Sequence, residues 1–218
     1  MHVFRNLVRP LILLIVATTM TVTAMASEPE LHQAAARNDA ARVEALLKAG
    51  ARVDARDPSE RTALLAATHA NAIDVARVLI AAGADVNAKD NIQDSPYLYA
   101  SAAGHIEILR MTLKAGADLK SVNRFGGTGL IPAAERGHVD VIRELIKAGV
   151  AIDHVNRLGW TALLEAIILS DGGPTHVEIV KLLIAAGSDV NLADKDGVTP
   201  LAHAEKMGYR EIAGLLKA

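Results

Sequence analysis

The dipeptide Ala-Gly recurs at a fixed step of 33 residues, and this period limits the possible folds more than any other feature of the chain. It stands at Ala49-Gly50, Ala82-Gly83, Ala115-Gly116 and Ala148-Gly149, and it returns at Ala186-Gly187 after a step of 38. A period of this length means that one supersecondary unit, unable to bury its apolar face alone, is copied so that neighbouring units cover each other. The chain is therefore expected to form a stack of similar units.

Each unit carries the signals of two helices. Alignment on the repeated glycine gives six units, at about 28–56, 57–89, 90–122, 123–155, 156–193 and 194–218. The first helices are expected to begin near Leu31, Thr62, Ser95, Thr128, Thr161 and Thr199. In five of the six units this residue has a hydroxyl group, which accepts from the free N–H groups of a first helical turn. The second helices carry paired aliphatic residues and end at the repeated glycine, where a left-handed residue closes a helix.

Three segments have the order and spacing of a known repeat: Gly83-Ala84-Asp85-Val86-Asn87, Gly104-His105-Ile106-Glu107 and Thr199-Pro200-Leu201. They resemble the ankyrin repeat, a β-turn followed by two antiparallel helices, and the resemblance covers about residues 30–218. It implies an all-α ankyrin-repeat solenoid of about six helix-turn-helix units with β-turn fingers. It also implies a non-enzymatic protein-protein interaction module.

The chain departs from the ankyrin pattern at three places. Only His32 stands at the usual histidine of the first helix, and apolar residues replace it in the other units. Gly129 and Pro132 both fall in the first turn of a helix, so an irregular start is expected there. Five extra residues, 170–174, lengthen the turn between the two helices of the fifth unit, which is expected to leave the stack unbroken.

The first 26 residues predict a cleavable signal peptide. Arg5 and Arg9 give a basic start, residues 11–22 are uncharged and mostly apolar, and Ala24-Met25-Ala26 fits a small-x-small cleavage site. A membrane anchor is the alternative, but the apolar stretch is shorter than the roughly 20 residues that a spanning helix needs. Cleavage would leave residues 27–218 as a single ankyrin repeat domain with no membrane association.

The segment from Gly159 to Leu201 also resembles bacterial ankyrin proteins that carry a signal peptide, so the periplasm is the expected location. The chain has no cysteine, which excludes disulfides and thiolate metal sites. Its formal net charge of −2 lacks the basic excess of nucleic-acid binders and of proteins that bind anionic membranes. A monomer with a protein partner is expected.

The sequence offers no set of residues for catalysis or for a cofactor or metal. Six histidines are spread over five units, at His69, His105, His138, His154, His176 and His203. Equivalent positions in neighbouring units lie about 10 Å apart, which is too far for shared metal coordination at about 2.1 Å. We therefore interpret these histidines as structural and predict no enzyme activity.

The turn tips of three consecutive middle units carry apolar residues, Ile92, Phe125 and Leu158, with Arg124 and Arg157 beside them. Apolar anchors flanked by arginine have the composition of binding hot spots. The alternative is that each side chain folds back on the adjacent hairpin. The only tryptophan, Trp160, sits at the base of a turn. Two interpretations of this residue stay equally open, packing across neighbouring hairpins and contact with a partner.

In ankyrin stacks, the first helices line the concave face, where four further residues are expected: Tyr99, Glu135, Arg136 and Glu165. Their mixed charges suit a protein partner better than a polyanion. Together with the tips, they form the predicted protein-binding surface. Two other roles stay open: an accessory factor that stabilises a periplasmic enzyme, and a secreted effector that binds a host protein.

Overall fold

A computed structural model describes residues 28–218 of the chain. The predicted signal peptide therefore lies outside the described residues. The chain divides into two compact units at Ala84 and Asp85, and each is considered by itself. None of the helices in residues 28–218 has the length and apolar character needed to cross a bilayer.

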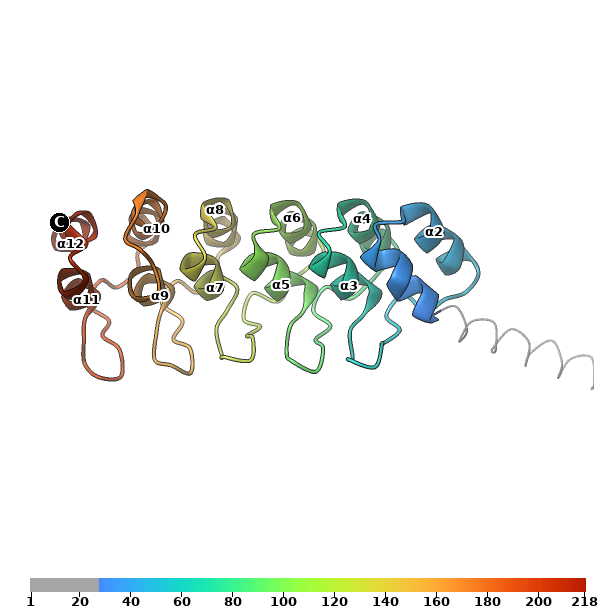
Figure 1. Ribbon diagram of the computed structural model, residues 1–218, viewed down its shortest axis with the longest axis horizontal. Helices are drawn as coiled ribbons and strands as arrows, with labels where there is room; N and C mark the ends of the chain where they lie inside the picture. Colours follow the sequence, from blue (N-terminus) through green and yellow to red (C-terminus); the bar gives the residue numbers. More distant parts are fainter. Residues whose placement is uncertain (1–27) are drawn as a thin grey trace, which may run out of the picture. The chain divides into compact units, whose positions relative to one another are not determined.

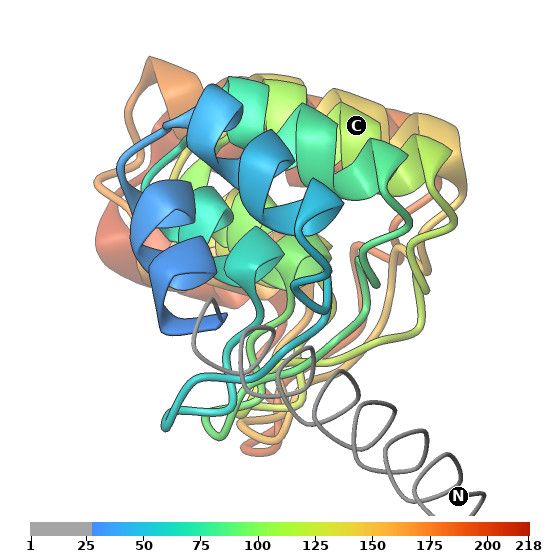
Figure 2. The same ribbon diagram turned by 90° about the vertical axis from the view of Figure 1, so that its right-hand side faces the viewer.

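The N-terminal unit contains two helix pairs. Residues 28–36 are helical and are followed by α2 (Ala40–Lys48); the second pair is α3 (Ala63–His69) and α4 (Ile73–Ala81). Figure 2 shows α2 and α4 in one layer and residues 28–36 with α3 in the other. Val43, Leu46, Leu65 and Leu79 are buried between these layers.

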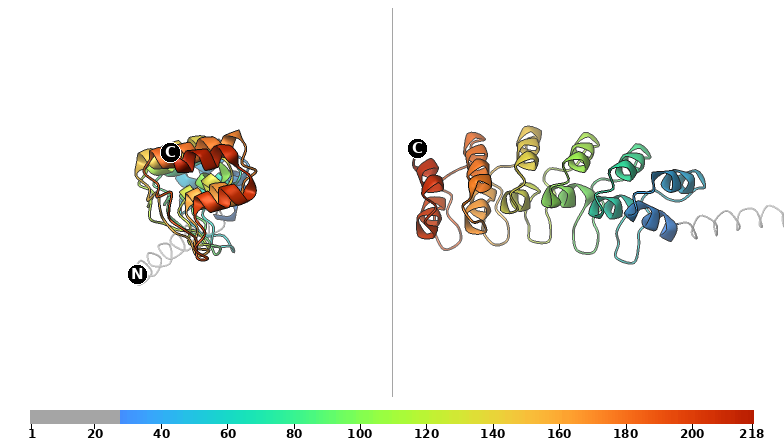
Figure 3. Two further views of the ribbon diagram at one scale, coloured as in Figure 1. Left: turned by 90° about the vertical axis from the view of Figure 1, so that its left-hand side faces the viewer. Right: turned by 45° about the horizontal axis from the view of Figure 1, so that its top comes forward.

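The C-terminal unit contains four helix pairs. They are α5 (Pro96–Ala103) with α6 (Ile106–Lys114), α7 (Leu130–Glu135) with α8 (Val139–Ala148), α9 (Ala162–Ile168) with α10 (Pro174–Ala185), and α11 (Pro200–Met207) with α12 (Arg210–Lys217). The odd-numbered helices form one layer and the even-numbered helices the other, and long hairpins extend from the odd-numbered layer (Figures 1 and 3). With the N-terminal unit this makes six helix pairs and no strand in residues 28–218, which confirms the predicted all-α repeat fold.

The helix starts follow the capping signals in the sequence. The hydroxyl groups of Thr62, Ser95, Thr161 and Thr199 each accept from the backbone N–H three residues later, at 3.2 Å. The second helices end as expected too, since Gly83 and Gly187 adopt φ values of 87° and 92°.

The predicted irregular start of α7 is confirmed. Thr128 does not cap the helix, which begins only at Leu130 with Gly129 at the N-cap position. The Thr128 hydroxyl is buried and has no hydrogen-bond partner. Gly129 itself is required by packing, because a Cβ atom there would lie 2.7 Å from Ser101 Oγ and 3.2 Å from the Tyr97 hydroxyl. Tyr97 is fully buried, as expected of a core residue.

The insertion in the fifth unit forms a loop between α9 and α10 and leaves the helix stack continuous. Pro174 begins α10, and α9 and α10 pack on each other and on the next pair, α11 and α12. The Tyr209 hydroxyl donates a 2.6 Å hydrogen bond to the carbonyl of Ser170, which ties the loop to the last unit.

Candidate protein-binding surface

Every hairpin is built around one aspartate or asparagine at its first position. The side-chain oxygen of this residue accepts from the backbone N–H groups two and four residues later, at 2.8 to 3.0 Å. This is an Asx turn, which a short polar side chain forms with its own backbone. The five residues concerned are Asp57, Asp90, Asn123, Asn156 and Asp194.

The hairpin of residues 123–127 and that of residues 156–160 are joined at their tips. The backbone N–H of Arg157 donates to the carbonyl of Phe125 at 2.9 Å, and the Arg157 guanidinium donates to the carbonyl of Arg124 at 2.8 Å. His154 Nε2 lies 2.7 Å from the carbonyl oxygen of Gly126. These bonds hold the two tips at a fixed separation before any partner arrives.

A groove of about 270 Å³ opens between these hairpins and the first helices of the third to fifth units. Seven of the predicted binding residues line it: Tyr99, Arg124, Phe125, Glu135, Arg136, Leu158 and Glu165. Phe125 and Leu158 remain 52% and 50% exposed, so neither folds back fully onto a neighbouring hairpin. The structure thus brings tips and concave helix positions together in one hollow.

Three predicted residues do not line the groove. Ile92 is 46% exposed on its own tip, and Arg157 is used to join the two hairpins. Trp160 is half-buried, and its backbone belongs to the Asx turn of Asn156. Whether these three contact a partner stays a prediction.

The floor of the groove holds a buried carboxylate. Glu165 is 5% exposed, and its Oε1 atom accepts a 2.7 Å hydrogen bond from Nδ2 of Asn156. The Asn156 oxygen is already engaged by Leu158 N–H and Trp160 N–H, so its amino group must face Glu165. In the last unit the same two positions hold Asp194 and His203, also 2.7 Å apart.

Burial raises the pKa of Glu165 to about 7 because water no longer solvates the charge. The negative charge of Glu135 adds to this effect, while the Asn156 hydrogen bond and the positive charge of Arg136 partly offset it. Glu165 is therefore close to half ionised at neutral pH.

Two of the lining residues that the sequence did not predict contribute chemistry to the groove, Asn156 and Leu169. Asn156 holds a turn position that Asn123 also occupies, so the sequence does not single it out, and only the fold brings its side chain 2.7 Å from Glu165. Leu169 is 48% exposed at the end of α9, directly before the insertion. The residues before and after Leu169 in the sequence do not indicate that its side chain lines the groove.

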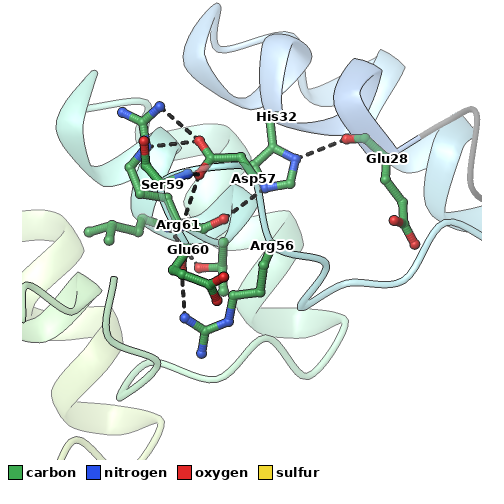
Figure 4. A network of polar contacts seen from close by, with 9 residues as sticks. Glu28, His32, Arg56, Asp57, Ser59, Glu60 and Arg61 are labelled. Atoms are coloured by element: carbon green, nitrogen blue, oxygen red, sulfur yellow. Dashed lines mark hydrogen bonds and ion pairs between the residues drawn. The ribbon is translucent and has the colours of Figure 1, made fainter. Parts of the chain in front are cut away.

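The N-terminal unit has a separate hollow of about 690 Å³ beside the hairpin of residues 57–61. Figure 4 shows the polar contacts of His32, one of the residues that line it. His32 spans its wall: Nδ1 lies 2.9 Å from the Glu28 carbonyl oxygen, and Nε2 lies 2.9 Å from the Arg61 carbonyl oxygen. Arg61 also pairs with Asp57 at 2.8 Å. Burial opposes ionisation of Asp57, but hydrogen bonds from the Arg61 side chain and backbone and from Ser59 lower its pKa overall. The contacts of His32 thus connect the helix of residues 28–36 to the hairpin of residues 57–61, and the pair of Arg61 and Asp57 lies within that hairpin.

The histidines also have structural partners. His138 Nε2 lies 3.2 Å from the Ala102 carbonyl oxygen, and His176 Nε2 lies 3.0 Å from that of Glu135. Within residues 28–218 no three histidine or acidic side chains gather as metal ligands would. The groove itself has apolar side chains at its rim and charged side chains at its floor.

Comparison with known proteins agrees with the repeat architecture. The family model described as "Ankyrin repeats (3 copies)" matches residues 31–123 and 97–194. A crystal structure of an ankyrin repeat domain from Acinetobacter baumannii AYE is 62% identical, with a TM-score of 0.84. The aligned region covers 86% of this chain and 96% of that one.

Two further relatives carry the same repeat. The crystal structure of the ankyrin repeat protein EF0377 is 43% identical with a TM-score of 0.83, over 86% of this chain and 96% of that one. YahD of Escherichia coli (strain K12), whose name describes an ankyrin repeat protein, is 51% identical over 55 residues. That match covers 25% of this chain and 27% of YahD, so it extends over about a quarter of either protein.

Proposed function

Because the chain belongs to the ankyrin repeat family, we propose that it is a non-enzymatic protein-binding module of the periplasm that captures its partner in the groove of the third to fifth units. Members of this family are generally non-catalytic binding modules. The observation that carries the proposal is the convergence of Phe125 and Leu158 with Glu135 and Glu165 on one hollow. These residues come from two hairpins and two helices, so the fold alone brings them together.

The physics of the groove supports capture of a protein. Half-exposed apolar side chains at a rim release water when a partner covers them, which favours association by about 25 cal/mol per Å². The bonds between the two hairpin tips fix the rim in advance, and a preformed surface lowers the ordering cost of binding. The Arg124 guanidinium also holds the Phe125 ring, because it lies over the face of the ring at 4.9 Å from the centroid.

The periplasmic part of the proposal rests on residues 1–26. It is tested by fractionating cells of the source organism and sequencing the N-terminus of the protein in the periplasmic fraction. A chain that begins at Ser27 is expected. Recovery of the uncleaved chain from the cytoplasm or from the membrane would contradict this location.

The binding part is tested by a pull-down from periplasmic extract with the wild-type protein and the double variant Phe125→Asp/Leu158→Asp. Loss of the dominant partner in the double variant is expected, with an unchanged unfolding midpoint. Met207→Asp is the matched control, since Met207 is an exposed apolar residue of the same unit outside the groove. Partner capture that survives the double variant would contradict the groove as the binding site.

The identity of the partner separates the roles left open by the sequence. A single enzyme captured in a 1:1 ratio would indicate an accessory factor that stabilises that enzyme by mass action. Capture of a protein from another organism, with none from the periplasm, would indicate a secreted effector.

Ile92→Asp tests how far the surface extends, because Ile92 continues the line of tips beyond the groove.

A further inference from the structure

The groove combines an apolar rim with carboxylates at its floor, and this combination limits what can fill it. Phe125, Leu158 and Leu169 are each about half exposed at the rim, whereas Glu165 is buried below them. The volume of about 270 Å³ lies below the range of small-molecule sites, which span about 300 to 1,000 Å³. It therefore suits one or two side chains of a protein segment.

The two arginines at the groove are engaged within the chain. Arg124 lies 3.5 Å from the Asp94 carboxylate, and its guanidinium also stacks on Phe125. Arg136 donates a 2.9 Å hydrogen bond to the carbonyl of Ala102. An incoming anion would have to compete with these contacts.

The carboxylates of Glu135 and Glu165 form no ion pair with any residue in the range 28–218, and neither does Arg136. The positive charge of Arg136 only partly offsets the two carboxylates, so the floor carries a net negative charge when Glu165 is ionised. The hydrogen bond that Glu165 receives comes from the neutral Asn156 amide. A partner that covers the groove removes the remaining water, so an ionised Glu165 would then need a positive charge beside it.

We infer that the groove selects a protein segment that places a lysine or arginine side chain against Glu165 and Glu135 and an apolar side chain between Phe125 and Leu158. This inference rests on the proposed function, because it names the chemistry of the partner at the same site. The charge complementarity is specific: a basic side chain relieves the repulsion between the two glutamates, and an acidic one increases it.

The site also makes binding depend on pH. Because burial holds the pKa of Glu165 near 7, the carboxylate is mostly protonated at pH 5.5 and mostly ionised at pH 8. A basic side chain binds the ionised form, so its affinity rises with pH over this range. The charged groups that act on Glu165 are Glu135, the last residue of α7, and Arg136, which follows it. His176 Nε2 lies 3.0 Å from the Glu135 carbonyl oxygen, and His203 Nε2 lies 2.7 Å from the Asp194 carboxylate.

The test is selection from a random 12-residue peptide library on phage, panned against purified wild-type protein at pH 8. Selected peptides are expected to pair lysine or arginine with a neighbouring apolar residue. A synthetic peptide from this set should bind Glu165→Gln at least tenfold more weakly and Asp140→Asn equally well. Asp140 is the matched control because it is an exposed carboxylate of the same unit, on α8, outside the groove.

The outcomes separate the inference from the proposed function. Wild-type affinity should fall at least threefold from pH 8 to pH 5.5, whereas affinity for Glu165→Gln should stay constant. Peptides that need Phe125 and Leu158 but bind Glu165→Gln equally well would overturn the inference and leave the binding surface in place. Peptides indifferent to all three residues, or no selection at all, would overturn the inference, and the pull-down then decides the proposed function independently.

Discussion

The side-chain amide of Asn156 donates a 2.7 Å hydrogen bond to the carboxylate of Glu165, and both side chains are buried at the floor of the groove. The pair joins a hairpin to a helix in the same way as Asp194 and His203 do in the last unit, with donor and acceptor exchanged. Asn156 supplies a donor that Glu165 accepts, and Asp194 accepts from His203. In these two units the two positions therefore carry complementary groups.

Glu165→Gln is expected to stabilise the protein at high pH. An unfolded glutamate has a pKa near 4.3, whereas burial raises the pKa of folded Glu165 to about 7. The folded state thus holds the proton of Glu165 more tightly than the unfolded state does. The contribution of this proton to the free energy of unfolding is complete below about pH 4 and is lost as the pH rises to 7. Glutamine keeps the oxygen that Asn156 binds and carries no charge.

Urea unfolding measures this effect as the difference in free energy of unfolding between Glu165→Gln and wild type. The difference should grow from near zero at pH 4 to about 3 to 4 kcal/mol at pH 8. Asp140→Asn should show no such growth. A constant difference between Glu165→Gln and wild type across this range would contradict the assignment of a buried, destabilised carboxylate.

Asn156→Asp is expected to destabilise the protein at pH 8 by about 1 to 3 kcal/mol, because it sets a second carboxylate beside Glu165. The Asx turn itself should survive, since aspartate holds the same position in the hairpins that begin at Asp57, Asp90 and Asp194. The double variant Asn156→Asp/Glu165→His recreates the pairing of the last unit and should recover most of the loss. A double-mutant cycle measures this coupling, and simple additivity of the two changes would refute it.

Gly129→Ala is expected to cost about 1 to 3 kcal/mol of stability, because the new Cβ would overlap the Ser101 side chain at 2.7 Å. The backbone at Gly129 is ordinary helix, with φ of −57°, so the loss comes from packing alone. Gly214→Ala is the matched control: Gly214 lies inside α12 with nothing within 4 Å of its Cβ position. Thermal or urea unfolding should show a gain of up to about 1 kcal/mol for that variant.

His32→Leu is expected to loosen the helix of residues 28–36. The imidazole links residues 28–36 to the hairpin of residues 57–61 through the carbonyl of Arg61, 29 positions away (Figure 4). Leucine fills the space but cannot donate, so the loss should be about 1 kcal/mol. Amide hydrogen exchange should speed up in residues 28–36 and stay unchanged in the C-terminal unit; a uniform change in both would contradict the local role.

The repeat period and the capping residues were sufficient to predict the helix pairs, their starts and the irregular entry into α7, because these depend on local chemistry. The exposure of Phe125 and Leu158 followed from the same alignment, since equivalent tips point to solvent. The bond between Asn156 and Glu165 escaped prediction because the path of the chain between a hairpin and a helix decides which side chains meet. The position of Leu169 in the groove was not predicted because Leu169 borders the insertion, where the repeat alignment does not show which way a residue faces.

Site-specific photocrosslinking in cells of the source organism tests the central claim most directly. The photoreactive residue p-benzoylphenylalanine is placed at Phe125 or Leu158 in the groove, and at Met207 outside it as the control. The account predicts one covalent protein adduct of the same mass from both groove positions and none from position 207. Adducts from position 207 alone, or none from either groove position, would contradict the assignment of this groove as the partner-binding site.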